Sequence, residues 1–381
     1  MTALPTPRID ADFPGGNILQ DGRDGDTLFL RQDLRDTEGH WFWWYFRARD
    51  CAGCRLLFSF TDGCVVGHRG PAVSRDGGRT WEWLGRDSVV RTEKGFAFEA
   101  RFPDDAEDTR FAFSIPYVES DLLRFATARD GALRIEELCR SRHGRSVQLL
   151  RAGPAGGTAA RRLLLTARHH ACESIASFVL EGILEAATGP GPTARLLRRT
   201  EILAVPFVDK AGVEAGDQGK NRRPHDHNRD YVDNAIYPET IALRNLVLGD
   251  SVANPFAALD LHCPYMSGDL SRLVYVVGSA HGPNAVAQRI LCDALETLRS
   301  GPWPFRAHDY LPFGTGWNTG KNYGAGVPAG RWFASCPNCL LSATVEISYA
   351  DMRGVPVTPE NARAFGRDLA RALALSLPSA C

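Results

Sequence analysis

The sequence has 381 residues, 44% of them hydrophobic and 23% charged, and a formal net charge of −1. This length exceeds that of a typical single domain, so we expect two domains. The near-zero charge provides neither the basic field needed to bind nucleic acid nor a cationic face for membranes. We find no secretory signal and no apolar run near the ~20 residues that cross a bilayer, so we expect a cytoplasmic protein.

Ten cysteines are present, and four of them form the C-x-x-C pairs Cys51/Cys54 and Cys336/Cys339. The two pairs are far apart in the sequence, and neither has the second pair nearby that a zinc ribbon needs. Cytoplasmic chains do not usually keep disulfides. We therefore expect reduced, partly buried thiols rather than one shared structural metal.

Residues 1–114 have the alternating apolar pattern of short β-strands. Trp41–Phe46 is an aromatic strand, and Leu56–Phe60 follows after a Cys-Ala-Gly-Cys turn. Further alternation occurs at Phe96, Phe98, Ala100 and Phe102, and at Phe111, Phe113 and Ile115. Several such strands with Gly/Asp turns between them predict a small antiparallel β-sandwich.

The segment Ser74–Trp81 fits one copy of the Asp-box of sialidase-like propellers. Those folds need several copies, and we find one. We interpret the segment as a tight Asp-Gly-Gly hairpin turn that Trp81 anchors.

From residue 115 the pattern changes to strands alternating with helices, which predicts an α/β domain over 115–381 with a mixed, mostly buried sheet. Short apolar runs suited to strands are 146–150, 163–167, 201–207, 257–261, 273–277 and 344–347. We expect the first two to form a hairpin. The helical periods are a stripe from Ile175 to Ala186, Asn284–Arg299, and Pro359–Leu377 with Thr358 as its N-cap.

The stretch Leu163–Glu173 organises the second domain, because a buried strand there leads into a polar turn. His170 and Glu173 are three residues apart, so both can face one cation. Histidine nitrogen and carboxylate oxygen are ordinary zinc ligands, and a catalytic site needs a third protein ligand. His262 ends the apolar run before it, at the strand end where ligands gather in such sheets.

Glu346 is the one acid in the apolar strand Thr344–Ile347, where an unpaired carboxylate is costly. It is either part of a buried salt bridge or at work beside a metal. The loop His225–Arg229 is polar and cationic, which suits either solvent or an anion.

Five motifs then occur in one order: His170-x-x-Glu173, Pro206-Phe207-x-Asp209-x-x-Gly212-Val213, Asp226-x-Asn228-Arg229, Leu259-Asp260-Leu261-His262 and Thr344-x-Glu346-Ile347-Ser348. Together they resemble the zinc metallocarboxypeptidases, and more narrowly the cytosolic carboxypeptidase-like branch with an N-terminal β-sandwich. Tyr117–Leu122 resembles the start of that branch's catalytic domain. The resemblance covers nearly the whole chain.

The resemblance implies that His170, Glu173 and His262 bind one zinc ion per chain and that Glu346 is the general base. Asn228 and Arg229 would hold the terminal carboxylate of a peptide or protein substrate. Arg222 or Arg223 would face the oxyanion, with Arg222 preferred, and Tyr323 would be the mobile tyrosine. Cys172 stands where digestive members carry arginine.

The resemblance also points to Arg331 as the residue that selects the last side chain of the substrate, because it lies about fifteen positions before Glu346. A guanidinium there would favour acidic C-terminal residues. A surface or structural arginine is the alternative.

Two other functions use the same features differently. A zinc amidohydrolase of the aspartoacylase or succinylglutamate-desuccinylase type also uses H-x-x-E and a later histidine, but the long preceding sandwich argues against it. A non-catalytic module would bind carbohydrate or protein through the aromatic residues Trp41–Trp44.

Overall fold

The structure, a computed structural model, describes residues 6–93, 95–129, 131–154, 158–249 and 254–378. The chain divides into two compact units. The first comprises Met1–Val118 and Gly212–Arg222, and the second comprises Glu119–Ala211 and Arg223–Cys381. The chain therefore leaves the second unit after Ala211, adds a short segment to the first, and returns.

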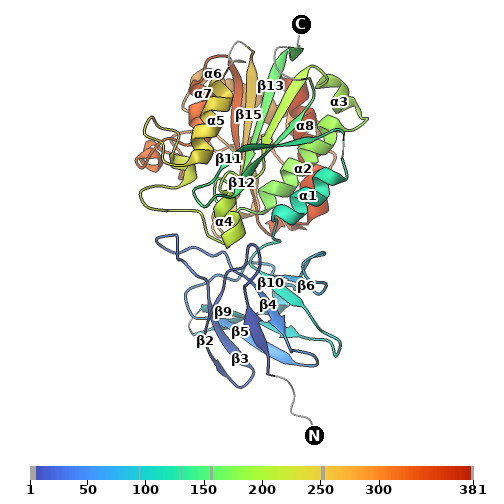
Figure 1. The fold of residues 1–381 in the computed structure, drawn as a ribbon, viewed down its shortest axis with the longest axis vertical. Coiled ribbons are helices and arrows are strands. Elements are labelled where there is room, and N and C mark those ends of the chain that lie inside the picture. Colours follow the sequence, from blue (N-terminus) through green and yellow to red (C-terminus); the bar gives the residue numbers. More distant parts are fainter. Residues whose placement is uncertain (1–5, 94, 130, 155–157, 250–253, 379–381) are drawn as a thin grey trace. The chain divides into compact units, whose positions relative to one another are not determined.

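The first unit holds two five-stranded sheets (Figure 1). In spatial order, one contains β1 (Arg8–Asp10), β4 (Tyr45–Arg49), β10 (Thr109–Ala112), β6 (Ala72–Ser74) and β7 (Glu82–Trp83). The other contains β2 (Leu19–Asp24), β3 (Thr27–Arg31), β5 (Arg55–Phe60), β9 (Gly95–Arg101) and β8 (Val89–Thr92). Neighbouring strands are antiparallel except β3 and β5, which pair in parallel.

Aromatic rings from both sheets fill the space between them. Phe46 on β4 lies 5.3 Å, centroid to centroid, from Phe58 on β5, and Phe111 on β10 lies 5.2 Å from Phe98 on β9. All four side chains are buried. The alternation that predicted the strands therefore also built the core of this unit.

The predicted strand Trp41–Phe46 is wrong for its first four residues, since β4 begins at Tyr45. The side chain of Gln218 takes the place of a neighbouring strand: its Oε1 accepts from the Trp43 amide at 2.7 Å, and its Nε2 donates to the Trp43 carbonyl at 2.8 Å. Phe42, Trp43 and Trp44 are at most 3% exposed. These three rings are therefore core, and within Trp41–Trp44 the side chain of Trp41 alone is partly exposed, so little remains of the aromatic surface that a non-catalytic module would need.

The turn Ser74–Trp81 connects β6 and β7, which pair antiparallel, so the hairpin interpretation is confirmed. Asp76 Oδ1 accepts from the backbone amides of Arg79 and Thr80, and the Trp81 indole donates to the Gly78 carbonyl at 3.1 Å. Burial raises the pKa of Asp76, but the hydrogen bonds from the Thr80 hydroxyl and amide, the Ser74 hydroxyl and the Arg79 amide lower it by more, to about 2.

A seven-stranded mixed sheet forms the centre of the second unit. Its spatial order is β11 (Arg134–Arg140), β12 (Ser146–Ala152), β14 (Thr200–Val205), β13 (Arg161–Ala167), β15 (Phe256–His262), β17 (Cys339–Ile347) and β16 (Val274–Val277). The four strands β14, β13, β15 and β17 are parallel, and every residue of β13 and β15 is buried. The predicted fold class is confirmed.

The predicted hairpin of 146–150 with 163–167 is wrong, because β14 lies between β12 and β13. β12 pairs antiparallel with β14, and β13 pairs with β14 and β15 in parallel. The Gly/Pro loop between β12 and β13 includes residues 155–157, which lie outside the described residues. The position of β13 at the centre of the sheet matters most for the site, because its end leads into the turn with His170.

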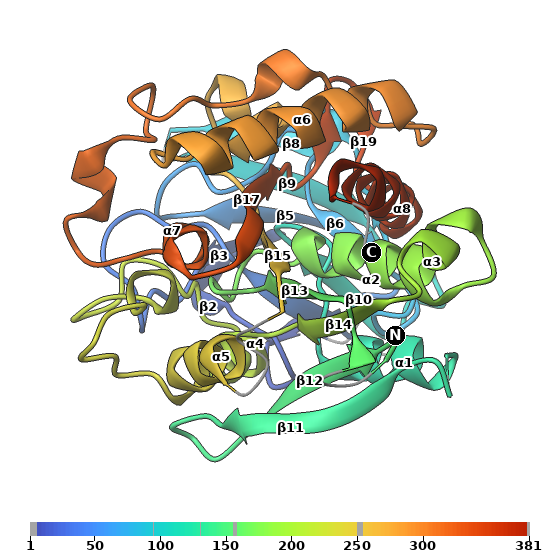
Figure 2. The same cartoon turned by 90° about the horizontal axis from the view of Figure 1, so that it is seen from above.

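Helices cover both faces of this sheet (Figure 2). They are α1 (Glu119–Thr127), α2 (Ile175–Thr188), α3 (Pro192–Leu196), α4 (Lys210–Ala215), α5 (Pro238–Leu248), α6 (Gly282–Leu298), α7 (Ala329–Ser335) and α8 (Pro359–Ser376). In that view α2 and α8 lie on one face and α5 and α7 on the other. A small ribbon of β18 (Asp351–Met352) and β19 (Val355–Pro356) precedes α8.

Two glycines let α2 and α8 approach closely. A Cβ at Gly182 would lie 2.1 Å from the Arg363 carbonyl, and one at Gly366 would lie 2.2 Å from the Val179 carbonyl. No larger residue fits at this crossing without moving a helix. Since α2 begins directly after the turn with His170 and Glu173, the close packing of α2 on α8 helps to fix the position of that turn.

The three predicted helices are confirmed, with ends that differ by one or two residues, and Thr358 Oγ1 caps α8 by accepting from Asn361 N at 3.2 Å. Among the helices of the described chain, none has both the length and the apolar character required to cross a bilayer.

Candidate metal centre and substrate site

The carboxyl ends of β13 and β15 bring three potential metal ligands together. His170 and Glu173 lie in the turn after β13, and His262 is the last residue of β15. His170 Nδ1 lies 2.9 Å from Glu173 Oε1, and His262 Nδ1 lies 2.7 Å from Glu173 Oε2. The two imidazole Nδ1 atoms are 3.2 Å apart. Because β13 and β15 are parallel neighbours in register, residues distant in sequence meet here.

These residues fit a zinc ion. Each offers one ligand atom, and the three atoms lie within 4.8 Å of one another in a buried position. Two imidazole nitrogens and a carboxylate that converge in the interior are a common donor set of catalytic zinc, which leaves a position for water or substrate.

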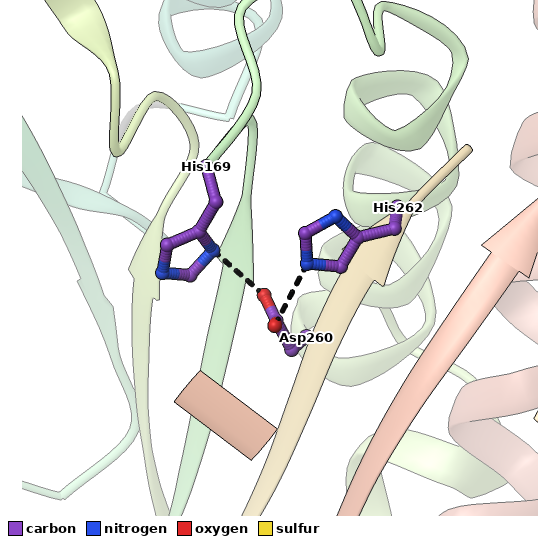
Figure 3. Close-up of side chains that lie close together, drawn as sticks. All are labelled: His169, Asp260 and His262. Atoms are coloured by element: carbon purple, nitrogen blue, oxygen red, sulfur yellow. Dashed lines mark hydrogen bonds and ion pairs between the residues drawn. The ribbon is translucent and has the colours of Figure 1, made fainter. Parts of the chain in front are cut away.

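Behind His262 lies a buried polar network (Figure 3). His262 Nε2 is 2.8 Å from Asp260 Oδ2, and His169 Nδ1 is 2.8 Å from Asp260 Oδ1. His169 Nε2 is 2.8 Å from the Tyr231 hydroxyl, and Thr166 Oγ1 donates to Asp260 Oδ1 at 2.8 Å. All five side chains are nearly inaccessible to solvent.

The network sets the charges of its members. Burial disfavours the charged form of Asp260, but the imidazoles of His169 and His262 hold the pKa of this carboxyl below its usual value. Burial lowers the pKa of His169, which keeps that ring neutral. Burial also lowers the pKa of His262, but Asp260 and Glu173 raise it by more, so it lies well above its usual value. A cation bound at Nδ1 must therefore displace a proton.

Glu346 lies beside the ligands. It pairs in the sheet with His262 on β15 and with Tyr275 on β16, and it is 8% exposed. Burial raises the pKa of Tyr275, and the Glu346 carboxylate raises it further. The carboxylate is therefore held at the same strand end as the candidate metal ligands.

Asn228 and Arg229 lie in a short 3₁₀ turn, His227–Arg229. Asn228 Oδ1 accepts from the Ala329 amide at 2.9 Å, and its Nδ2 is 3.4 Å from His262 Nε2. Arg229 donates to the carbonyl of Asn228 at 2.9 Å and to Asn322 Oδ1 at 3.3 Å. Both acceptors are neutral, so the partly buried guanidinium keeps its charge for an anion.

A cavity of about 300 Å³ lies next to Asn322 and Ala329, the residues that Arg229 and Asn228 contact. Tyr323, Arg331 and Thr344 line it, and Thr344 is two residues before Glu346 on β17. Arg331 lies over the Tyr323 ring at 5.3 Å, and the Tyr323 hydroxyl donates to Asn318 Oδ1 at 2.8 Å. Burial raises the pKa of Tyr323, while Arg229 and Arg331 lower it by less. Both arginines are thus near this tyrosine.

No protein-family profile matches the chain. Cytosolic carboxypeptidase 2 of Xenopus tropicalis is 33% identical over 262 residues, which cover 59% of this chain and 27% of the relative. Cytosolic carboxypeptidase 2 of Danio rerio is 28% identical over 267 residues, covering 60% of this chain and 36% of the relative. The chain thus matches only about a third of the length of these curated relatives.

The structure of a metallo-carboxypeptidase from Burkholderia cenocepacia superimposes with a TM-score of 0.78 at 22% identity, covering 98% of this chain and 99% of that one. At this identity the likeness shows the fold alone. The chain is therefore similar in fold to a metallo-carboxypeptidase and in part of its sequence to cytosolic carboxypeptidases.

Not every residue implied by the resemblance to this metallocarboxypeptidase family lies with the ligands. Arg222 belongs to the first unit, where its guanidinium bonds Asp36 at 2.9 Å and Asp217 at 2.8 Å. Two carboxylates offset its charge, and its role at the oxyanion stays a prediction. Arg223, in the second unit, is exposed.

Asp260 and Tyr231 had no predicted role at the site. One signal for Asp260 was present: residues i and i+2 of a strand share a face, so Asp260 and His262 had to lie side by side. Nothing comparable pointed to Tyr231, whose contact with His169 depends on the fold of the loop after β14.

Proposed function

We propose that the chain is a zinc-dependent carboxypeptidase that hydrolyses C-terminal peptide or isopeptide bonds, with a peptide or protein C-terminus as its substrate. The observation that supports this most is the meeting of three ligand residues with a buried glutamate at one end of the central sheet. Arg229 forms no ion pair with another described residue, and Asn228 lies beside it. Both side chains can therefore bind the free carboxylate at the end of a peptide, which supports an exopeptidase in particular.

In this proposal a zinc ion held by His170, Glu173 and His262 would polarise the scissile carbonyl and lower the pKa of water. Glu346 accepts a proton from the attacking water and delivers it to the leaving nitrogen. Arg229 binds the terminal carboxylate of the substrate, and the Asn228 amide donates to it as well. Arg222, or the exposed Arg223, faces the developing oxyanion.

The finer proposal is a preference for acidic C-terminal residues, set by Arg331. Arg331 lines the 300 Å³ cavity, and it forms no ion pair with another described residue. A free guanidinium at such a cavity attracts a side-chain carboxylate and repels lysine and arginine. Arg331 is exposed rather than buried at the base of the cavity, so its effect is smaller than that of a dry pocket.

The proposal extends to the location, the domains and the partners of the chain. We propose a cytoplasmic enzyme, with residues 1–114 as an N-terminal β-sandwich domain before a catalytic domain over 115–381, within which Gly212–Arg222 group with the first unit. We propose no nucleic-acid or membrane partner.

A peptide library with varied C-terminal residues tests the function. The zinc-loaded chain should release single C-terminal residues, seen by mass spectrometry as loss of one residue mass, and Glu346→Gln should release none above background. N-acetyl-aspartate and N-succinyl-glutamate belong in the same assay. Cleavage of these acyl amino acids without cleavage of any peptide would replace the carboxypeptidase by the deacylase alternative.

A further inference from the structure

His169 is adjacent to the ligand His170 in sequence, but its ring takes no part in the ligand cluster of His170, Glu173 and His262. Its two nitrogens contact Asp260 and Tyr231, both at 2.8 Å. The ring is stacked 5.7 Å from that of His262, and the His169 side chain has no exposed surface. Burial of an imidazole is costly unless both of its nitrogens have polar partners, and His169 has one at each nitrogen.

The contacts fix which nitrogen of each ring carries a hydrogen. The Asp260 carboxylate can only accept, so the hydrogen of a neutral His169 ring lies on Nδ1, and Nε2 accepts from the Tyr231 hydroxyl. The Nδ1–H of His169 then faces Asp260 Oδ1. The other carboxylate oxygen accepts from Nε2–H of His262, so that Nδ1 of His262 is the nitrogen that faces Glu173 and His170, and it becomes the ligand atom once a metal displaces its proton.

We propose that His169 is a positioning residue for the metal ligand His262, acting through Asp260, with Tyr231 as its anchor. The inference rests on the proposed zinc site. A carboxylate behind a ligating histidine fixes the ring and its tautomer, and such partners strongly affect metal affinity. Here the Asp260 carboxylate is itself held by His169, on the side opposite His262.

His169 matters because Asp260 alone is not rigid. Its carboxylate can rotate about the bond to Cβ unless both oxygens are bound. Thr166 and His169 hold Oδ1, while His262 takes Oδ2. The Tyr231 ring is in turn fixed by Trp332 and Phe333 of α7, each at 5.6 Å. Loss of His169 leaves the Thr166 hydroxyl as the remaining described partner of Oδ1, and a single rotatable hydroxyl holds the carboxylate less firmly than two partners do.

The test is the zinc dissociation constant of the full chain, measured by competition with a chromophoric chelator. His169→Leu removes both contacts and should weaken zinc binding about 10- to 100-fold. His169→Asn can place an amide near the position of Nδ1 and should stay within about threefold of the wild type. Tyr231→Phe should fall between the two, because the anchor is lost but Nδ1 remains.

Tyr310→Phe is the matched control. It also removes a buried hydroxyl, one that donates to Gln288 and does not contact the network, so zinc affinity should not change. Melting temperatures of the metal-free variants separate stability from affinity. A folded His169→Leu that binds zinc as tightly as the wild type overturns the inference, as does His169→Asn binding as weakly as His169→Leu.

If His169→Leu does not fold, His169→Asn and Tyr231→Phe decide, and unchanged affinity in Tyr231→Phe contradicts the anchor. Peptide cleavage plays no part in this comparison. Failure of the proposed function would show separately, as a wild-type chain that binds zinc tightly and cleaves no peptide.

Discussion

Replacement of Arg331 by leucine should reverse the preference of the enzyme between acidic and apolar C-terminal residues. Arg331 lines the cavity beside Tyr323 but is exposed. Two unit charges 4 Å apart interact by about 4 kcal/mol at an effective dielectric of 20 and by about 1 kcal/mol in water. For an exposed guanidinium we take about 1–2 kcal/mol, which corresponds to about a 5- to 30-fold change in kcat/KM.

The assay compares kcat/KM for two peptides that differ only in a final Glu or Leu, at low and high salt. Arg331→Leu should lose about 5- to 30-fold on the Glu peptide and gain on the Leu peptide, and the wild-type preference should shrink with salt. Arg331→Lys keeps the charge and serves as the matched control, with most of the preference retained. Equal changes on both peptides would show that Arg331 does not contact the substrate's last side chain.

Four further outcomes follow from the structure. His262→Ala should lose most bound zinc in metal analysis, because two protein ligands rarely hold the ion; full stoichiometry would rule out His262 as a ligand. Glu346→Gln should keep fold and zinc but lose several orders of magnitude in kcat, and near-normal turnover would place the base elsewhere. The pKa of Asp76 is lowered to about 2 in the folded chain, so the stability that its carboxylate provides is complete above the unfolded value near 3.8 and is lost as pH falls through 2. The free energy of unfolding should therefore be larger for the wild type than for Asp76→Asn near pH 5, and the difference should shrink towards pH 2. A difference that does not change with pH would contradict this. Gly366→Ala should cost about 1–3 kcal/mol of unfolding free energy by denaturant titration, whereas Gly191→Ala, where a Cβ meets nothing within 4 Å, should cost little; equal effects would show that the α2–α8 crossing is not tight.

Local pattern predicted those elements whose partners did not need to be known. The apolar runs that became β13 and β15 and the Thr358 cap of α8 depend on residues close in sequence. The hairpin of β12 with β13 failed because a strand from much further along the chain, β14, enters between them. Strand order is a nonlocal choice that alternation does not encode.

The same division applies to the candidate site. His170 and Glu173 are three residues apart, and sequence alone could pair them. Their meeting with His262 and Glu346 depends on β13, β15 and β17 being parallel neighbours in register, which only the motif order suggested. The helices α1, α3, α4, α5 and α7 were not predicted, because elements of 5 to 11 residues contain too few turns for a helical period to be recognised.

The path of the chain between the two units limits how this protein can be divided or recombined. The segment Gly212–Arg222 is part of the first unit, where Asn17 donates to the Gly216 carbonyl at 2.7 Å and Gln218 binds both backbone groups of Trp43. Removal of residues 1–118 would leave Gly212–Arg222 without its contacts to the first unit, directly before the loop that carries Asn228 and Arg229. Neither unit can therefore be exchanged as a cassette by a single crossover, and the first unit is expected to travel with the second through gene fusion and duplication.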